Sequence, residues 1–139
     1  MPRPSPLIKI SNTEALGAKV ILEGENVDEC FEFVKKYQEK NNNIYISPFH
    51  DPLVIAGQGT IAFELVKQID TIDFIFGSIG GGGKMAGVGF VAKEIFENVK
   101  VIGAQAKGAS SMVQSLQKGE LVLQKEKVST FADGIKVQR

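Results

Sequence analysis

The sequence predicts an α/β fold, with a three-layer parallel sheet of about four strands and helices on both faces. Short β-branched apolar segments alternate along the chain with longer segments in which apolar residues recur at helical spacing. One of the apolar segments runs directly into four consecutive glycines, Gly80–Gly83. At 139 residues and 43% hydrophobic content, we expect a single α/β unit over residues 1–139.

The first part of the chain predicts two helices and two strands. A short helix over residues 7–16 follows a proline-rich start and ends at Gly17, and a buried strand covers residues 18–22. Asn26 opens the next helix, because Glu29 stands three positions later in capping-box spacing. Apolar residues share one face of this helix: Cys30, Phe33, Val34 and Tyr37. The asparagines at 41–43 end it, and residues 44–46 predict the second strand.

The remainder of the chain continues the alternation. Asp51 reads as a helix cap with Pro52 at the first helical position, and one face of that helix carries Ile61, Leu65 and Ile69. We then expect a strand over 73–79, a helix over 83–96, a strand over 99–104 and a helix over 110–117 that Gly119 stops. Residues 121–123 are a candidate for one further short strand.

Composition excludes several classes of partner. Lysine and arginine number 16, and aspartate and glutamate also number 16, so a neutral chain gives no electrostatic reason to bind nucleic acid or an anionic membrane. No stretch approaches the roughly 18 apolar residues of a membrane span, and the N-terminus has no apolar signal core. The lone cysteine, Cys30, forms no internal disulfide and is expected in the core, which favours a cytoplasmic location.

The glycines Gly80–Gly83 are the candidate binding site. They follow a predicted strand and precede a helix, which is where ligands bind in open parallel sheets. Without Cβ atoms, successive backbone N–H groups can converge on an anion beside the helix N-terminus, so phosphate fits. The alternative, a turn or tight helix–strand packing, stays open. Lys84 could add charge, although a solvent-exposed lysine is the ordinary expectation.

Two other patterns carry less information. The site lacks the lysine and hydroxyl residue of a P-loop, so nucleoside triphosphates are not implied, and the G-x-G-x-x-A letters of residues 57–62 follow no strand. His50, the single histidine, precedes Asp51 and Pro52 and reads as a neighbour of a helix cap, not as a general base. We therefore predict no catalytic residue.

Several runs together resemble the threonine dehydratase (threonine ammonia-lyase) and serine racemase family of pyridoxal-phosphate enzymes, fold type II. The matching runs keep the family's order: Pro6-Leu7-Ile8-Lys9, Glu14-Ala15-Leu16-Gly17-Ala18, Pro48-Phe49-His50-Asp51-Pro52, Ile55-Ala56-Gly57-Gln58-Gly59-Thr60, Gly80–Gly83 with Ala86-Gly87, and Ala132-Asp133-Gly134-Ile135. The resemblance implies that Gly80, Gly81, Gly82 and Gly83 hold the phosphate of pyridoxal 5'-phosphate. It also implies β-elimination from L-threonine or L-serine, giving a 2-oxo acid and ammonia.

The departures from the family pattern are equally informative. The family carries its cofactor on a lysine in a Ser-Phe-Lys-x-Arg-Gly type segment, followed by a Ser-x-Gly-Asn-His type loop, and neither pattern occurs here. Some members bind a divalent cation through a glutamate after the fourth strand and an acidic residue six positions on, where this chain has Gln105 and Ser111. We therefore expect no metal.

Two hypotheses follow. The chain resembles an internal fragment of such a dehydratase, with the end of the small domain at about 1–50 and the start of the large domain at about 51–139. It would retain the phosphate loop and be inactive alone. The alternative is a non-catalytic, flavodoxin-like α/β module that binds phosphate or no ligand. Under both, we expect self-association into a homo-oligomer, for example a strand-swapped dimer.

Overall fold

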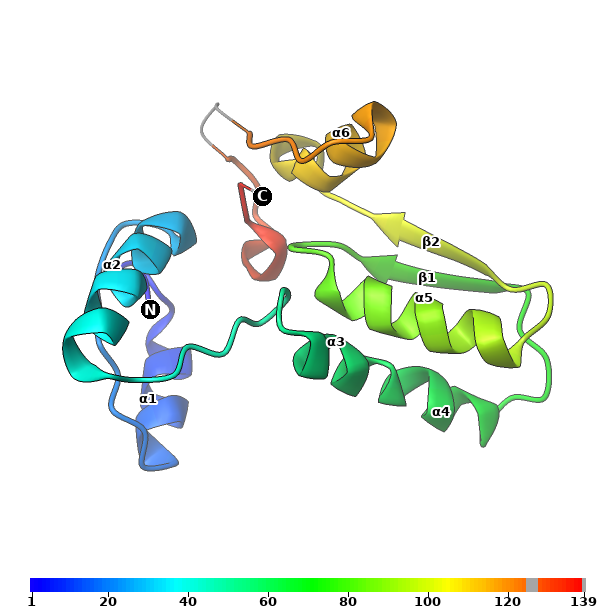
Figure 1. Ribbon diagram of the computed structural model, residues 1–139, viewed down its shortest axis with the longest axis horizontal. Coiled ribbons are helices and arrows are strands. Elements are labelled where there is room, and N and C mark those ends of the chain that lie inside the picture. The colour runs from blue at the N-terminus through cyan, green and yellow to red at the C-terminus, as the bar shows by residue number, and fades with distance from the viewer. Residues whose placement is uncertain (125–127, 139) are drawn as a thin grey trace. The chain divides into compact units, whose positions relative to one another are not determined.

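The computed structural model describes residues 1–124 and 128–138. The chain divides into two compact units, Met1–Tyr45 and Ile46–Arg139 (Figure 1). Among the described residues, no helix has both the length and the apolar composition that crossing a membrane requires.

The unit Met1–Tyr45 contains the two predicted helices, α1 (Leu7–Ala15) and α2 (Val27–Asn41). Gly17 follows α1 in a left-handed conformation, with φ of 84°. At the start of α2, the Asn26 side-chain oxygen accepts a hydrogen bond of 3.0 Å from the Glu29 amide, and the Glu29 carboxylate accepts one of 2.7 Å from the Asn26 side-chain amide. These reciprocal bonds confirm the capping signal and fix where α2 begins.

Neither predicted strand of this unit is formed. A strand needs a neighbour that supplies a ladder of backbone hydrogen bonds. In the segment after α1, backbone hydrogen bonds run to the short N-terminus: the Glu23 amide donates to the Met1 carbonyl at 2.9 Å, and the Arg3 amide donates to the Gly24 carbonyl at 2.8 Å. Residues 18–22 and 44–46 form no strand, a correction to the sequence prediction.

The unit Ile46–Arg139 is built on a parallel pair of strands, β1 (Phe74–Ser78) and β2 (Lys100–Ala104). Their register joins Phe74 to Lys100 at one end and Ser78 to Ala104 at the other. Helix α5 (Gly83–Ile95) connects them, so the unit is a β-α-β crossover, as the sequence predicts. The described residues contain this two-stranded sheet in place of the four strands expected, and residues 121–123 form no strand.

Helices α3 (Pro52–Gln58) and α4 (Thr60–Val66) pack against α5, which lies between them and the sheet in Figure 1. The sequence predicts one helix here, but the chain breaks at Gly59, where α5 approaches closely. A Cβ on Gly59 would lie 2.6 Å from a Val91 methyl carbon, and a Cβ on Gly87 would overlap the Ile55 carbonyl oxygen. The absence of a side chain at Gly59 and at Gly87 thus allows α5 to pack closely against the junction of α3 and α4.

The core lies between these helices and one face of the sheet. Its buried members are Ala62, Ala92, Phe96 and Val99, and the partly buried residues packed against them are Ile72, Ile75, Val91 and Val101. The other face is not covered by the described residues, since Phe74 is 51% and Phe76 is 70% exposed. The expectation of helices on both faces is thus met on one face only.

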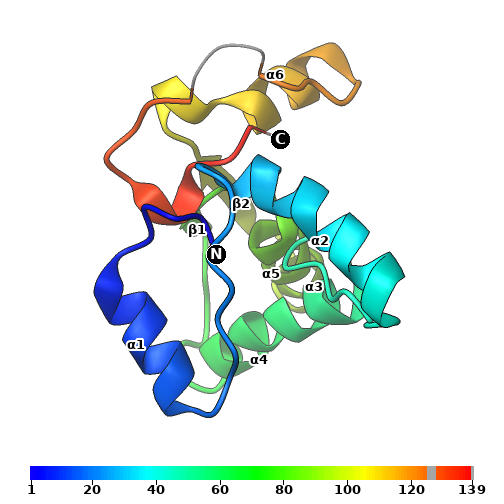
Figure 2. The ribbon, with the colours of Figure 1, turned by 90° about the vertical axis from the view of Figure 1, so that its left-hand side faces the viewer.

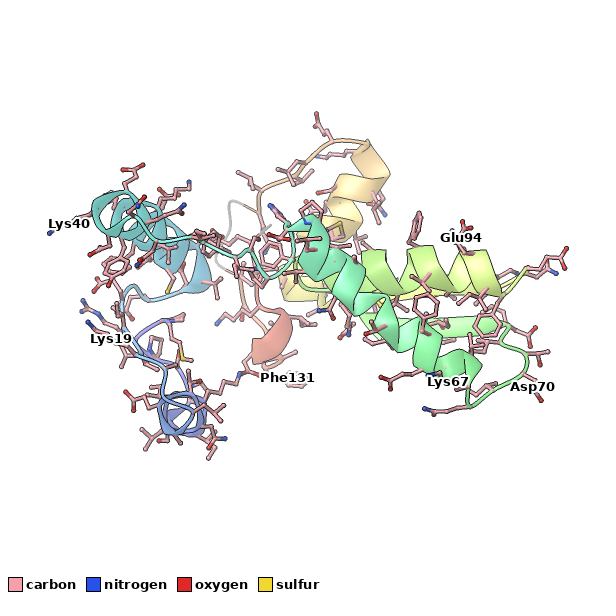
Figure 3. The ribbon with its side chains drawn as sticks, turned by 60° about the horizontal axis from the view of Figure 1, so that its bottom comes forward. Lys19, Lys40, Lys67, Asp70, Glu94 and Phe131 are labelled. Carbon is pink, nitrogen blue, oxygen red and sulfur yellow. The ribbon has the colours of Figure 1, made fainter. Side chains whose placement is uncertain are left out.

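The chain after β2 forms α6 (Ser111–Lys118), preceded by the 3₁₀ turn η1 (Lys107–Ala109) and followed by η2 (Asp133–Ile135). Gly119 ends α6 in a left-handed conformation with φ of 70°, as the sequence predicts. Phe131, before η2, is completely exposed (Figure 3). In both ribbon views η2 lies beside the carboxyl end of β1 (Figures 1 and 2), where it closes one side of a cavity.

Candidate functional site: a glycine-lined cavity at the end of β1

A cavity of about 230 Å³ opens at the carboxyl end of β1. This volume is several times the ~30 Å³ that a water molecule occupies in the liquid, so a phosphate group has room. Its wall is formed by the end of β1, the glycine loop, the first turn of α5 and two further segments: Ser78, Ile79, Gly80–Gly83, Lys84, Met85, Pro48, Phe49, Gly134 and Ile135.

The loop is held at both of its ends. The Ile79 amide donates to the Ala104 carbonyl at 2.8 Å, which extends the β1–β2 ladder one residue past β1. Gly82 then turns the chain with φ of 90°, a left-handed conformation that suits glycine, and caps α5. The first helical bond runs from the Ala86 amide to the Gly82 carbonyl at 2.9 Å.

Six consecutive backbone amides at this cavity have no acceptor. Among the described residues, the N–H groups of residues 80 to 85 donate no hydrogen bond, and all six residues line the cavity. No side chain caps α5 and no acidic residue stands in its first turn. Unpaired amides and the positive end of the helix dipole together favour an anion here.

The glycines are also required by packing. A Cβ on Gly83 would lie 2.7 Å from the Phe49 Cα atom, and one on Gly81 would enter the Phe49 ring. On the other side, a Cβ on Gly80 would lie 3.3 Å from the Ile135 Cα atom. The glycines therefore allow close packing against Phe49 and Ile135, which differs from the helix–strand packing that the sequence raised as an alternative, and the same missing side chains leave the amides uncovered.

The charged side chain at this cavity is basic. The Lys84 ammonium donates a hydrogen bond of 3.0 Å to the Ser78 hydroxyl, and both residues line the cavity. Among residues 1–124 and 128–138, no aspartate or glutamate lines the cavity. Asp70 and Glu94 lie at the opposite end of this unit, near the start of β1 and the end of α5 (Figure 3). The local charge is therefore positive.

The remaining candidates lie outside the cavity wall. Asp51 caps α3 as predicted, since its carboxylate accepts hydrogen bonds from Leu53 at 2.8 Å and Val54 at 3.2 Å. The His50 ring meets the Phe49 ring edge-on at 4.8 Å and does not line the cavity. Sequence reasoning missed Phe49 and Ile135 as cavity walls, although both stand in runs that carry the family resemblance.

Cys30 is partly buried, and its thiol donates to the Glu23 carbonyl at 2.9 Å. Burial raises the pKa of this thiol above its ordinary value, and the nearby Glu29 and Glu23 carboxylates add to the rise, while the N-terminal ammonium opposes it. A raised pKa leaves less of the nucleophilic thiolate at neutral pH. Cys30 is thus a partly buried thiol, and the expectation that it lies in the core is not met, because α2 has no buried residue.

Gln105 and Ser111, at the positions of the family's cation ligands, lie near the start of α6. The Gln105 side-chain oxygen, Oε1, accepts a hydrogen bond of 3.1 Å from the Val113 amide, while the Gln105 Nε2 and Ser111 Oγ atoms are buried without a partner among the described residues. Among the described residues, no group of three or more histidine, cysteine, aspartate or glutamate side chains is placed to hold a metal ion.

Comparisons with known proteins agree with this arrangement. The sequence profile of the family described as "Pyridoxal-phosphate dependent enzyme" matches residues 1–139. The L-threonine ammonia-lyase of Thermotoga maritima is 43% identical over 139 residues, which are 100% of this chain and 34% of that protein. The chain thus spans about a third of the length of this curated relative.

Two solved structures share the fold. The processed form of threonine deaminase isoform 2 from Solanum lycopersicum superposes with a TM-score of 0.89 at 44% identity, covering 99% of this chain and 38% of that one. Maize serine racemase gives a TM-score of 0.88 at 32% identity, covering 98% of this chain and 41% of that one. These likenesses confirm the predicted α/β class and the resemblance to the threonine dehydratase and serine racemase group.

Proposed function

Since the chain belongs to the pyridoxal-phosphate dependent enzyme family, we propose that Gly80–Gly83 hold the phosphate of pyridoxal 5'-phosphate. The observation that carries this proposal is the run of six amides that, among the described residues, have no acceptor and line a cavity without a carboxylate. Backbone N–H groups at a helix N-terminus bind phosphate oxygens without any charged side chain, so the site needs no further ligand to be selective for an anion.

We infer that the protein takes part in the β-elimination of L-threonine or L-serine to a 2-oxo acid and ammonia. The relatives named above, an L-threonine ammonia-lyase and a threonine deaminase, support this reaction. When bound, the cofactor supplies the electron sink for the substrate carbanion. The residues of this chain hold its phosphate, and Phe49 and Ile135 form apolar walls beside the loop.

We propose that residues 1 to about 50 correspond to the end of the small domain of such an enzyme, and residues from about 51 to the start of its large domain. The 139 residues contain no segment of the cofactor-lysine type, and the lysine that lines the cavity, Lys84, is engaged with the Ser78 hydroxyl. We therefore expect this chain to bind the phosphate group without turnover of either amino acid.

The test compares three ligands on the 139-residue chain: pyridoxal phosphate, pyridoxal and inorganic phosphate. Pyridoxal phosphate and inorganic phosphate should compete for one site, and pyridoxal should not displace either of them. Equal binding of pyridoxal and pyridoxal phosphate would show that the phosphate group contributes nothing. Absence of phosphate binding would favour the non-catalytic module.

Borohydride reduction with equimolar pyridoxal phosphate tests the inference that these 139 residues lack the cofactor lysine. Mass spectrometry should find no single lysine that carries one pyridoxal phosphate label per chain. Stoichiometric labelling of a single lysine would contradict the inference that these 139 residues lack the cofactor lysine.

We also propose that the chain self-associates through its sheet. Each strand of the β1–β2 pair has one edge without a partner in the described residues, and the exposed Phe74 and Phe76 rings stack on one face, 6.0 Å apart. Open strand edges beside an apolar face pair readily with a second copy. Light scattering should show a dimer or larger oligomer, and a monomer at high concentration would refute the proposal.

A cytoplasmic location is the last part of the proposal. Its support is the single cysteine, Cys30, which is free and has no partner for an internal disulfide. Fractionation of cells that express the chain should recover it in the cytoplasmic fraction, and recovery from another compartment would contradict this part.

A further inference from the structure

Lys84 stands at an electrostatically unfavourable place in α5. It is the second residue of the helix, at the positive end of the helix dipole, where anionic side chains are the favourable ones. The first turn of α5 contains no acidic residue to offset it. A lysine here therefore costs stability in the absence of a ligand.

In the part of the chain that the structure describes, no carboxylate pairs with the Lys84 charge. Among the described residues Lys84 makes no ion pair, and its contact is the 3.0 Å hydrogen bond to the neutral Ser78 hydroxyl. Ser78 ends β1 and Lys84 begins α5, so the bond joins the two sides of the glycine loop. The ammonium of the exposed Lys84 is thereby held at the wall of a cavity that has no acidic side chain among its described lining residues.

We propose that Lys84 is a phosphate-binding residue, positioned by Ser78, and that it makes the cavity selective for a phosphate monoester dianion. This inference rests on the proposed function of Gly80–Gly83. The amides supply hydrogen bonds that any oxyanion can accept. The Lys84 ammonium adds a full positive charge, so its attraction is stronger for a dianion than for a singly charged anion. The same charge that is unfavourable in the free chain becomes favourable once the anion is bound.

Two effects of opposite sign follow for Lys84→Gln, a change that keeps helix propensity similar. The variant should bind inorganic phosphate and pyridoxal phosphate about three- to tenfold more weakly, as expected for loss of one charge close to the anion. In phosphate-free buffer it should unfold at a slightly higher denaturant concentration than the parent chain. The difference in phosphate affinity should shrink as salt rises, because ions screen exposed charges.

Lys93→Gln is the matched control. Lys93 lies in the last turn of α5, about 13 Å along the helix axis from Lys84, where a cation favours the dipole. This control should bind phosphate as the parent does and should be slightly less stable. Lys84→Arg keeps the charge and should retain most of the phosphate affinity, which separates the role of charge from that of shape.

Titrations of the 139-residue chain with inorganic phosphate, pyridoxal phosphate and pyridoxal separate the outcomes. Weaker phosphate binding by Lys84→Gln with unchanged binding by Lys93→Gln supports the inference. Equal phosphate affinity of the parent and Lys84→Gln overturns the proposed role of Lys84, while the proposed phosphate binding by Gly80–Gly83 is unaffected. Failure of the parent chain to bind either phosphate ligand overturns the loop's proposed function and the inference with it. Tighter binding of pyridoxal phosphate than of inorganic phosphate identifies the cofactor as the source of the phosphate.

Discussion

Replacing Gly83 by alanine should destabilise the unit Ile46–Arg139, although alanine is the better helix former. The added Cβ would lie 2.7 Å from the Phe49 Cα, 2.9 Å from its Cβ and 3.1 Å from its carbonyl oxygen. To reach 3.4 Å, where van der Waals contact becomes ordinary, the Phe49 backbone must retreat by roughly 0.7 Å. Backbone yields less easily than a side-chain tip, so the change resembles overpacking of a core.

Overpacking costs about 1–3 kcal/mol, and the gain in helix propensity from glycine to alanine returns up to ~1 kcal/mol. The expected net loss in the free energy of unfolding is about 1–2 kcal/mol. The matched control is Gly57→Ala in α3, where the added Cβ has no neighbour within 4 Å. That change should stabilise the same unit by about 0.5–1 kcal/mol.

Urea unfolding of the parent chain and both variants, followed by circular dichroism, measures these differences. The two alanine variants should differ by about 2 kcal/mol, with opposite signs relative to the parent. Equal stability of Gly83→Ala and Gly57→Ala would refute the close approach of Phe49 to the loop, and with it the packing role of the glycines.

Three further predictions concern other parts of the chain. Asp51→Ala should lower the free energy of unfolding by about 1 kcal/mol through loss of the α3 cap, with Asp51→Asn closer to the parent in the same urea experiment; equal loss in both would contradict a capping role. Phe96→Ala should cost about 3–4 kcal/mol, because this 8% exposed ring packs in the core; a loss below 1 kcal/mol in thermal unfolding would contradict that packing. Cys30 should react with a thiol reagent more slowly in the folded than in the urea-unfolded chain, since its pKa is raised. Because folding favours the protonated thiol, the free energy of unfolding should fall as pH rises past the ordinary thiol range. A free energy of unfolding that rises with pH there would contradict this sign.

The helix boundaries could be predicted because their signals are local. Asn26 with Glu29 caps α2, Asp51 with Pro52 begins α3, and Gly119 ends α6, each through bonds or backbone angles within a few residues. The parallel β-α-β order could also be predicted, since β1, α5 and β2 differ in hydrophobic period.

The number of strands could not be predicted in the same way. The apolar pattern of residues 18–22 marks a segment that could join a sheet, but a strand exists only where a neighbour supplies a ladder. Within Met1–Tyr45 the available neighbour is the short N-terminus, and residues 18–22 stay irregular. The break at Gly59 escaped prediction for a related reason, because it depends on the approach of α5 from another part of the chain.

The glycine loop of the candidate site could be predicted from the sequence, but the other walls of the cavity could not. Gly80–Gly83 stand next to each other in the chain, so their position between a strand and a helix could be read directly. The walls supplied by Phe49 and Ile135 come from segments more than 30 and 50 residues away, and only folding brings them to the loop. The Lys84–Ser78 hydrogen bond likewise depends on how the loop turns at Gly82.

The central claim is that the unpaired amides of the glycine loop bind a phosphate group. The most direct measurement is an amide NMR titration of the 139-residue chain with inorganic phosphate. We expect saturable shifts concentrated at residues 80–85, with the amides of α4 and of the end of α5 unchanged. A titration in which residues 80–85 do not shift, or shift no more than the rest of the chain, would contradict the claim and leave a loop of purely structural importance.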